Sequence, residues 1–196
     1  MLSTEELRAE IETAAKILEM TEIDVANMIL NETISEFEET NRHKRIQTRA
    51  TTYRLTNSET GAIFYEPANT LFVEHGHVGI YYNASSIIES MPGDGVRYMS
   101  CSDKRVESGS MKAKINQTAD QRWAASNWAY NCIGDSYSYN FATNRLTDAY
   151  GAKNCSKLVW SAYKETSGID LDANGGAGVY PNDIKNSSYL YSKFYF

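Results

Sequence analysis

A thiol, an imidazole and a carboxylate occur in this chain at positions from which they could act together. Cys155 follows a helix-capping asparagine, and His77 opens a predicted strand. Glu89 lies twelve residues after His77 (89 − 77 = 12), in the next predicted strand. Such a trio supplies a nucleophile, a base that takes its proton and a group that orients the base. The residue types therefore predict thiol catalysis by Cys155, His77 and Glu89.

The surroundings of Cys155 are set by a helix that we predict between Asn154 and Gly168. Asparagine is a favoured N-cap, and glycine suits the left-handed position just past a helix end. Apolar residues recur along one face of this helix at Cys155, Leu158, Val159, Ala162 and Tyr163. Free N–H groups and the positive dipole end of the first turn favour a thiolate and can hold an oxyanion. The alternative is that Cys155 is an ordinary core residue of this apolar face.

His77 and Glu89 are brought together by a predicted hairpin with strands over 77–82 and 86–91 and a turn at 83–85. If the hairpin is centred on Ala84, facing residues have numbers that sum to 168, so Glu89 faces Gly79. His77 and Glu89 then lie on one face as diagonal neighbours, with backbones about 7–8 Å apart. Gly79 has no side chain to separate them, and we count it among the substrate-binding positions. A slip of one residue would place the pair on opposite faces.

Taken singly, these residues have ordinary interpretations. His77 alone is typical of a half-buried histidine, and Glu89 alone of a solvated strand charge. His75 and His77 share one strand face, and with Glu89 they could bind zinc, but the sequence has no other histidine-rich segment to complete such a site. We therefore expect neither a metal nor a cofactor.

Residues 1–58 read as an N-terminal helical extension, and residues 59–196 as one hydrolase domain. Ser3 and Glu6 form a capping box, so the first helix is predicted to begin at Thr4, and a second helix after Thr21. Both helices are amphipathic, so they must cover the hydrolase core, each other or a second subunit. We also predict a helix over 118–132, with Trp123 and Trp128 near its inner side, and a closing strand over 189–196.

Composition limits the classes of partner. The 196 residues are 42% hydrophobic and 22% charged, which is typical of a soluble globular protein. A net charge of −6 and a pI of about 5.1 disfavour nucleic acid and anionic membranes as partners. The sequence has no run of transmembrane length and no secretion signal, which predicts a cytoplasmic protein, or a secreted or cell-envelope protein whose leader was removed.

The cysteine count argues against a disulfide framework. Three cysteines make an odd number, and their spacing is not that of a metal site. A bridge between Cys101 and Cys132 remains an alternative, and it would leave Cys155 free. Otherwise both are packing residues.

Several segments resemble the YiiX-like branch of the circularly permuted NlpC-type papain-like cysteine hydrolases. They are residues 74–81 (EHGHVGIY), 87–92 (IIESMP), 154–160 (NCSKLVW) and 168–172 (GIDLD). The histidine precedes the cysteine, as in the permuted members, which include lecithin:retinol acyltransferase-like enzymes. The similarity extends from about Gly61 to Asp183. One departure is Gly61-Ala62, where the family often has Gly-Asp.

The resemblance implies an α+β fold, a permuted papain-like domain in which an antiparallel sheet packs with helices. It implies Cys155 as nucleophile, His77 as base and Glu89 as the orienting residue. Tyr137 resembles the tyrosine that lines the family's substrate cleft, and Tyr139 is the alternative. The expected activity is hydrolysis of an amide or peptide bond, with cell-wall peptides as one substrate class. Two alternatives stay open: an acyltransferase or thioesterase on lipid or acyl substrates, and a non-catalytic peptide-binding module.

Overall fold

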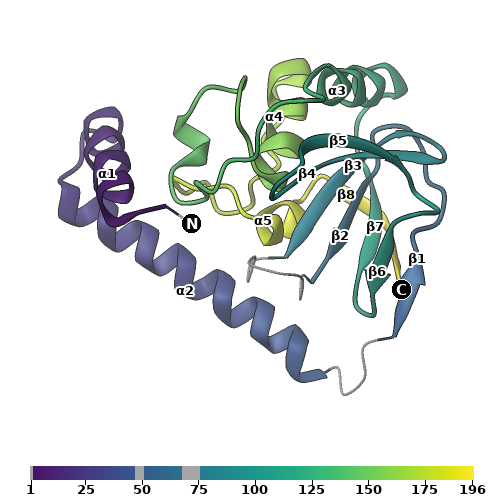
Figure 1. Ribbon diagram of the computed structural model, residues 1–196, viewed down its shortest axis with the longest axis horizontal. Coiled ribbons are helices and arrows are strands. Elements are labelled where there is room, and N and C mark those ends of the chain that lie inside the picture. Colours follow the sequence, from purple (N-terminus) through teal and green to yellow (C-terminus); the bar gives the residue numbers. More distant parts are fainter. Residues whose placement is uncertain (1, 47–50, 68–75) are drawn as a thin grey trace.

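Six antiparallel strands form the main sheet, in the order β5-β4-β3-β2-β7-β8, and β1 pairs with β6 in a separate two-stranded sheet (Figure 1). The structure, a computed structural model, describes residues 2–46, 51–67 and 76–196. Its strands are β1 Thr52–Arg54, β2 Ile63–Glu66, β3 His77–Asn83, β4 Ser86–Met91, β5 Gly95–Ser100, β6 Arg105–Glu107, β7 Met111–Ile115 and β8 Leu190–Tyr195. The predicted α+β class is confirmed.

Helices account for the rest of the regular structure. They are α1 Thr4–Leu18, α2 Glu22–Ile46, α3 Ala119–Asn131, α4 Cys155–Ser167 and α5 Pro181–Asn186, with a short 3-10 helix at Asn144–Leu146. The predicted starts of the first two helices are confirmed, and Ser3 and Glu6 form the predicted capping box. The helix predicted over 118–132 and the closing strand are also present.

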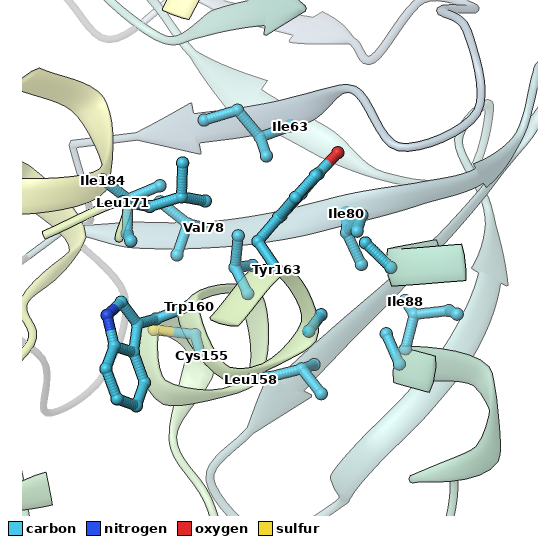
Figure 2. Close-up of a cluster of buried hydrophobic side chains, with 14 of the residues drawn as sticks. Ile63, Val78, Ile80, Ile88, Cys155, Leu158, Trp160, Tyr163, Leu171 and Ile184 are labelled. Carbon is cyan, nitrogen blue, oxygen red and sulfur yellow. The ribbon is translucent and has the colours of Figure 1, made fainter. Parts of the chain in front are cut away.

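The main core lies between the sheet and helices α3 and α4, both of which contact β3. Residues at alternate strand positions, Val78, Ile80 and Ile88 among them, are fully buried against this helical layer. Figure 2 shows Tyr163 of α4 projecting toward Ile63 and Ile80 of the sheet. The opposite face of the sheet carries a smaller apolar cluster with Phe64, Tyr81 and Ile87, and Leu55 and Val106 from the region of the two-stranded sheet complete it.

The N-terminal helices pack on each other and on the loop region that surrounds α4 and α5 (Figure 1). Their apolar contact consists of Ala14, Ala15, Val25 and Ile29 packed against Ala142 and Leu146. Acidic side chains add polar contacts: Glu32 accepts the amide of Ala177 (3.1 Å), and Glu36 accepts the Asn182 side-chain amide (2.8 Å). The helices therefore cover each other and this loop region. In the described part of the chain, no helix is long and apolar enough to cross a membrane.

Three expectations need comment. Trp123 is 60% exposed, so its predicted place near the inner side of α3 is wrong; the inner face is formed by Ala125, Ala129 and Cys132, which recur at helical spacing. The domain boundary between residues 58 and 59 stays a prediction, and β1 on its N-terminal side pairs with β6 beyond it. All three cysteines are free, so the alternative of a Cys101–Cys132 bridge is wrong.

Candidate active site

The hairpin of β3 and β4 has the predicted register. Gly79 pairs with Glu89, Ile80 with Ile88 and Tyr81 with Ile87, and the register shifts only next to the turn. Because side chains alternate along a strand, His77 and Glu89 lie on the same face of the sheet. This placement follows from the spacing of the two strands around a short turn.

The His77 and Glu89 side chains meet directly. Nε2 of His77 lies 2.8 Å from Oε2 of Glu89, and Glu89 has no exposed surface. Burial raises the pKa of the Glu89 carboxyl, but the hydrogen bond and charge of His77, followed by Lys104 and Arg97, lower it more, so the net pKa lies below its usual range. Glu89 is therefore a carboxylate at neutral pH.

Cys155 lies beside this pair, in the first turn of α4. Its thiol is close enough to the His77 imidazole to affect the pKa of His77. Burial and the Lys104 charge lower the pKa of His77, but a Cys155 thiolate and hydrogen bonds to Cys155 and Glu89 outweigh them and raise it to about 9. Since Glu89 binds Nε2, Nδ1 is the ring nitrogen left to face the thiol. Cys155 is also a member of the main core and is only 1% exposed.

The start of α4 is fixed by a polar network around Asn154. Its Oδ1 accepts the Lys157 amide (2.9 Å) as the predicted N-cap, and its side-chain amide donates to Asn140 O (2.8 Å). The Asn144 amide also donates to Oδ1 of Asn154 (3.2 Å). These bonds hold the first turn, and therefore the Cys155 backbone, in one position.

One hydrogen bond joins the hairpin directly to the start of α4. The buried hydroxyl of Ser90, next to Glu89 in β4, donates to the carbonyl oxygen of Lys153 (2.6 Å). Lys153 precedes Cys155 by two residues. This bond therefore joins β4 to the start of α4 at positions one residue from Glu89 and two residues from Cys155.

Of the two tyrosines that the sequence left as alternatives, Tyr137 is the one whose pKa is affected by the charge of Cys155. Burial, then the charge of a Cys155 thiolate and of Tyr139, raises the pKa of Tyr137. Tyr139 packs edge-on against Tyr137, with ring centroids 4.9 Å apart, and is 46% exposed. A substrate-binding role for either residue stays a prediction.

Gly79 is buried, and its missing side chain leaves room for an aromatic ring. A Cβ at this position would lie 2.4 Å from Cε1 of Phe64 and 2.9 Å from the Ile88 carbonyl oxygen. The Phe64 ring in turn lies near His77, with centroids 5.7 Å apart. The space beside Gly79 is therefore filled by Phe64, and a substrate-binding role for Gly79 stays a prediction.

Three charged residues of the site were not found from the sequence. Arg97 on β5 donates to Oε1 of Glu89 through Nε (3.0 Å) and Nη2 (2.6 Å). The Nζ atom of Lys104 lies 3.1 Å from Oε2 of Glu89 and 2.6 Å from Oε1 of Glu66. One signal was present for Arg97, because extending the hairpin logic around the turn at Gly93 pairs it with Glu89. Lys104 lies in a loop, where no periodicity points to it.

The zinc alternative involved His75, which lies outside the described residues. Within the ranges that the structure describes, no group of three or more histidine, cysteine, aspartate or glutamate side chains is arranged to hold a metal ion.

Comparison with known proteins identifies a related sequence and a solved structure with a similar fold. Uncharacterized protein YycO of Bacillus subtilis strain 168 is 48% identical over 138 residues, which are 70% of this chain and 56% of that protein. The chain therefore spans little more than half the length of this relative. The crystal structure of metalloprotein yiiX from Escherichia coli O157:H7 superposes with a TM-score of 0.51 at 12% identity, over 69% of this chain and 96% of that one. At this identity the likeness concerns the fold alone.

The family described as permuted papain-like amidase enzymes, YaeF/YiiX, C92 family, matches residues 47–182, a span that holds Cys155, His77 and Glu89. The family's description agrees with the resemblance that the sequence motifs indicated. The chain belongs to this family of permuted papain-like amidases.

Proposed function

We propose that the protein hydrolyses an amide or peptide bond with Cys155 as nucleophile, His77 as base and Glu89 as the residue that orients His77. The observation that supports the proposal is the 2.8 Å contact between Nε2 of His77 and Oε2 of Glu89, which leaves Nδ1 as the ring nitrogen available to the thiol. A histidine held in this way can exchange a proton with a cysteine at a helix start.

The reaction has two halves. His77 takes the Cys155 proton, and the thiolate attacks the substrate carbonyl to form a C–S bond and an oxyanion. The His77 imidazolium then protonates the leaving amine as the C–N bond breaks. A water molecule, deprotonated by His77, attacks the resulting thioester and releases the acid, which returns the thiol.

The oxyanion needs hydrogen-bond donors near the sulfur. The Lys157 amide is occupied by Asn154, so it does not serve this purpose. We propose the Cys155 amide, at the start of α4, as one donor, where the positive end of the helix dipole adds to its effect. Tyr137, whose phenol lies near the Cys155 sulfur, is our candidate for a group that lines the substrate cleft.

The candidate substrates are amides, with lipid or acyl substrates as the alternative. Amide substrates follow from the family, and cell-wall peptides are the candidate within that class. The acyltransferase and thioesterase alternatives share the thiolate and the acyl-enzyme, and differ in the group attacked. The 1% exposed fraction of Cys155 favours the remaining alternative, a peptide-binding module in which the thiol is a packing residue.

One experiment separates these functions. Purified protein and Cys155→Ala are incubated with peptidoglycan fragments, phospholipid vesicles and thioester probes, and products are identified by mass spectrometry. We expect release of amines from peptide fragments, and a loss of roughly 10³-fold or more in the variant. Turnover of only lipid or thioester probes would support the second enzyme class, and no product from either protein would leave the binding module. Equal products from both proteins would contradict Cys155 as the nucleophile.

A further inference from the structure

Lys104 is a buried cation next to the proposed catalytic pair. The residue is 7% exposed, and its Nζ lies between Oε1 of Glu66 (2.6 Å) and Oε2 of Glu89 (3.1 Å). Nζ also lies 5.3 Å from the centre of the Phe64 ring. The backbone of Lys104 is fixed on both sides, because its carbonyl accepts the Leu55 amide (3.0 Å) and its amide donates to the Cys101 carbonyl (3.2 Å).

The two oxygens of Glu89 have different partners. Arg97 occupies Oε1 through two nitrogens, whereas Oε2 is shared between Nε2 of His77 and Nζ of Lys104. A carboxylate oxygen that is bound by a second cation stabilises an imidazolium less than a free one does. Lys104 and His77 therefore compete for the same atom.

Competition for Oε2 of Glu89 affects how readily the His77 imidazolium gives up its proton. An imidazolium bound too firmly by its carboxylate is a weak acid toward the leaving amine, and one held too loosely loses its orientation. Resting on the proposed function, we propose that Lys104 is a positioning residue that fixes Oε2 of Glu89 against His77 and limits how strongly this oxygen holds the imidazolium. Glu66, paired with His77 across β2 and β3, anchors Lys104 at the required place.

Among the described residues, charged or titratable groups near His77 come from several elements. They are Glu66 on β2, Glu89 on β4, Asp94 just before β5, Arg97 on β5, Lys104 in the loop before β6, and Cys155 on α4. Among the causes that act on His77 after burial, the Lys104 charge lowers its pKa, whereas Cys155 and Glu89 raise it. Removing only the Lys104 charge should therefore leave the imidazolium more firmly protonated.

The test measures the titration of the His77 ring by NMR in the full chain, with His77→Gln to assign its signal. In Lys104→Met we expect the titration midpoint to rise by about one pH unit, and in Lys104→Arg to stay near that of the unmodified protein. Lys114→Met is the matched control, since Lys114 pairs with Glu59 (2.8 Å), which does not touch His77. Its midpoint should not move.

A second variant distinguishes an effect of the Lys104 charge from a loss of folding. Glu66→Gln keeps Lys104 but removes a negative charge near it, so its midpoint should fall, opposite in sign to that of Lys104→Met. Unchanged midpoints in both folded variants, or shifts of the same sign in both, would overturn the assignment of Lys104. The midpoints are measured without substrate, so this test is independent of amide hydrolysis. If the two variants shift in opposite directions but the protein hydrolyses no amide, the proposed function is wrong, whereas the effect of Lys104 on His77 is supported.

Discussion

Glu89 and His77, twelve residues apart in the chain (89 − 77 = 12), are joined by a 2.8 Å contact inside the protein. The contact depends on the β3–β4 register, in which Glu89 pairs with Gly79. Arg97 and Lys104 then hold the carboxylate from two further directions. A buried carboxylate with this many partners is a fixed point from which the histidine is oriented.

Replacing Glu89 by glutamine tests whether its carboxylate orients His77. Glutamine keeps the size of the side chain but removes the carboxylate that the half-buried Arg97 and the buried Lys104 share, so that each keeps one acidic partner, Asp94 and Glu66 respectively. We expect the free energy of unfolding to fall by about 2 kcal/mol, because the buried side chain loses charge-assisted hydrogen bonds. Amide hydrolysis should fall by on the order of 10²-fold from loss of histidine orientation.

Urea unfolding and steady-state kinetics measure the two effects of Glu89→Gln. Glu12→Gln is the control, since Glu12 forms an exposed ion pair with Lys16 on α1, and exposed pairs contribute little. If Glu89→Gln were as stable and as active as Glu12→Gln, the role assigned to Glu89 would be wrong.

The pH dependence of stability should report on His77. Its pKa is raised from 6.5 to about 9 in the folded protein, so the folded state binds this proton more tightly than the unfolded state. The resulting stabilisation is fully present below about pH 6.5 and is lost as the pH rises toward about 9. Its size is roughly 3 kcal/mol, from the difference between the two pKa values.

Unfolding free energies of the unmodified protein and His77→Gln, measured between about pH 6 and about pH 9.5, check this expectation. The difference between the two proteins should shrink as the pH rises. Because a Cys155 thiolate is one cause of the raised pKa, Cys155→Ala should flatten the same dependence. A difference that stays constant across this range would show that His77 does not gain its proton on folding.

Ser90→Ala removes the hydrogen bond between the hairpin and the start of α4. The loss of one buried bond to Lys153 O should lower the free energy of unfolding by about 1 kcal/mol, and turnover should fall because the thiol is less firmly placed. Ser126→Ala is the matched control, since this buried hydroxyl binds the Trp123 carbonyl within α3 (2.9 Å). Equal turnover in both variants would contradict a positioning role for Ser90.

Local patterns predicted the pieces of the site that are close in sequence. The hairpin register follows from two strands and a short turn, and the start of α4 follows from Asn154 as N-cap. Tyr137 could not be chosen over Tyr139, because the choice depends on how an irregular segment approaches Cys155.

The charged residues around Glu89 could not be predicted from local sequence patterns, because they depend on contacts between separate elements. Arg97 requires the β4–β5 register, and Glu66 requires the pairing of β2 with β3, which no short turn fixes. Lys104 lies in the loop before β6, and its contacts with Glu66 and Glu89 depend on the path of that loop, which no local pattern sets. Trp123 was misplaced because its size suggested burial, whereas small residues line the buried face of α3.

The most direct measurement of the central claim is the rate at which iodoacetamide alkylates Cys155 in the folded protein across a range of pH, with the modified residue located by mass spectrometry. We predict that Cys155 reacts faster than Cys101 and Cys132, that its reaction persists at mildly acidic pH, and that His77→Gln abolishes this advantage. A Cys155 that reacts no faster than the two other buried cysteines, or that reacts only after unfolding, would contradict a thiolate paired with His77.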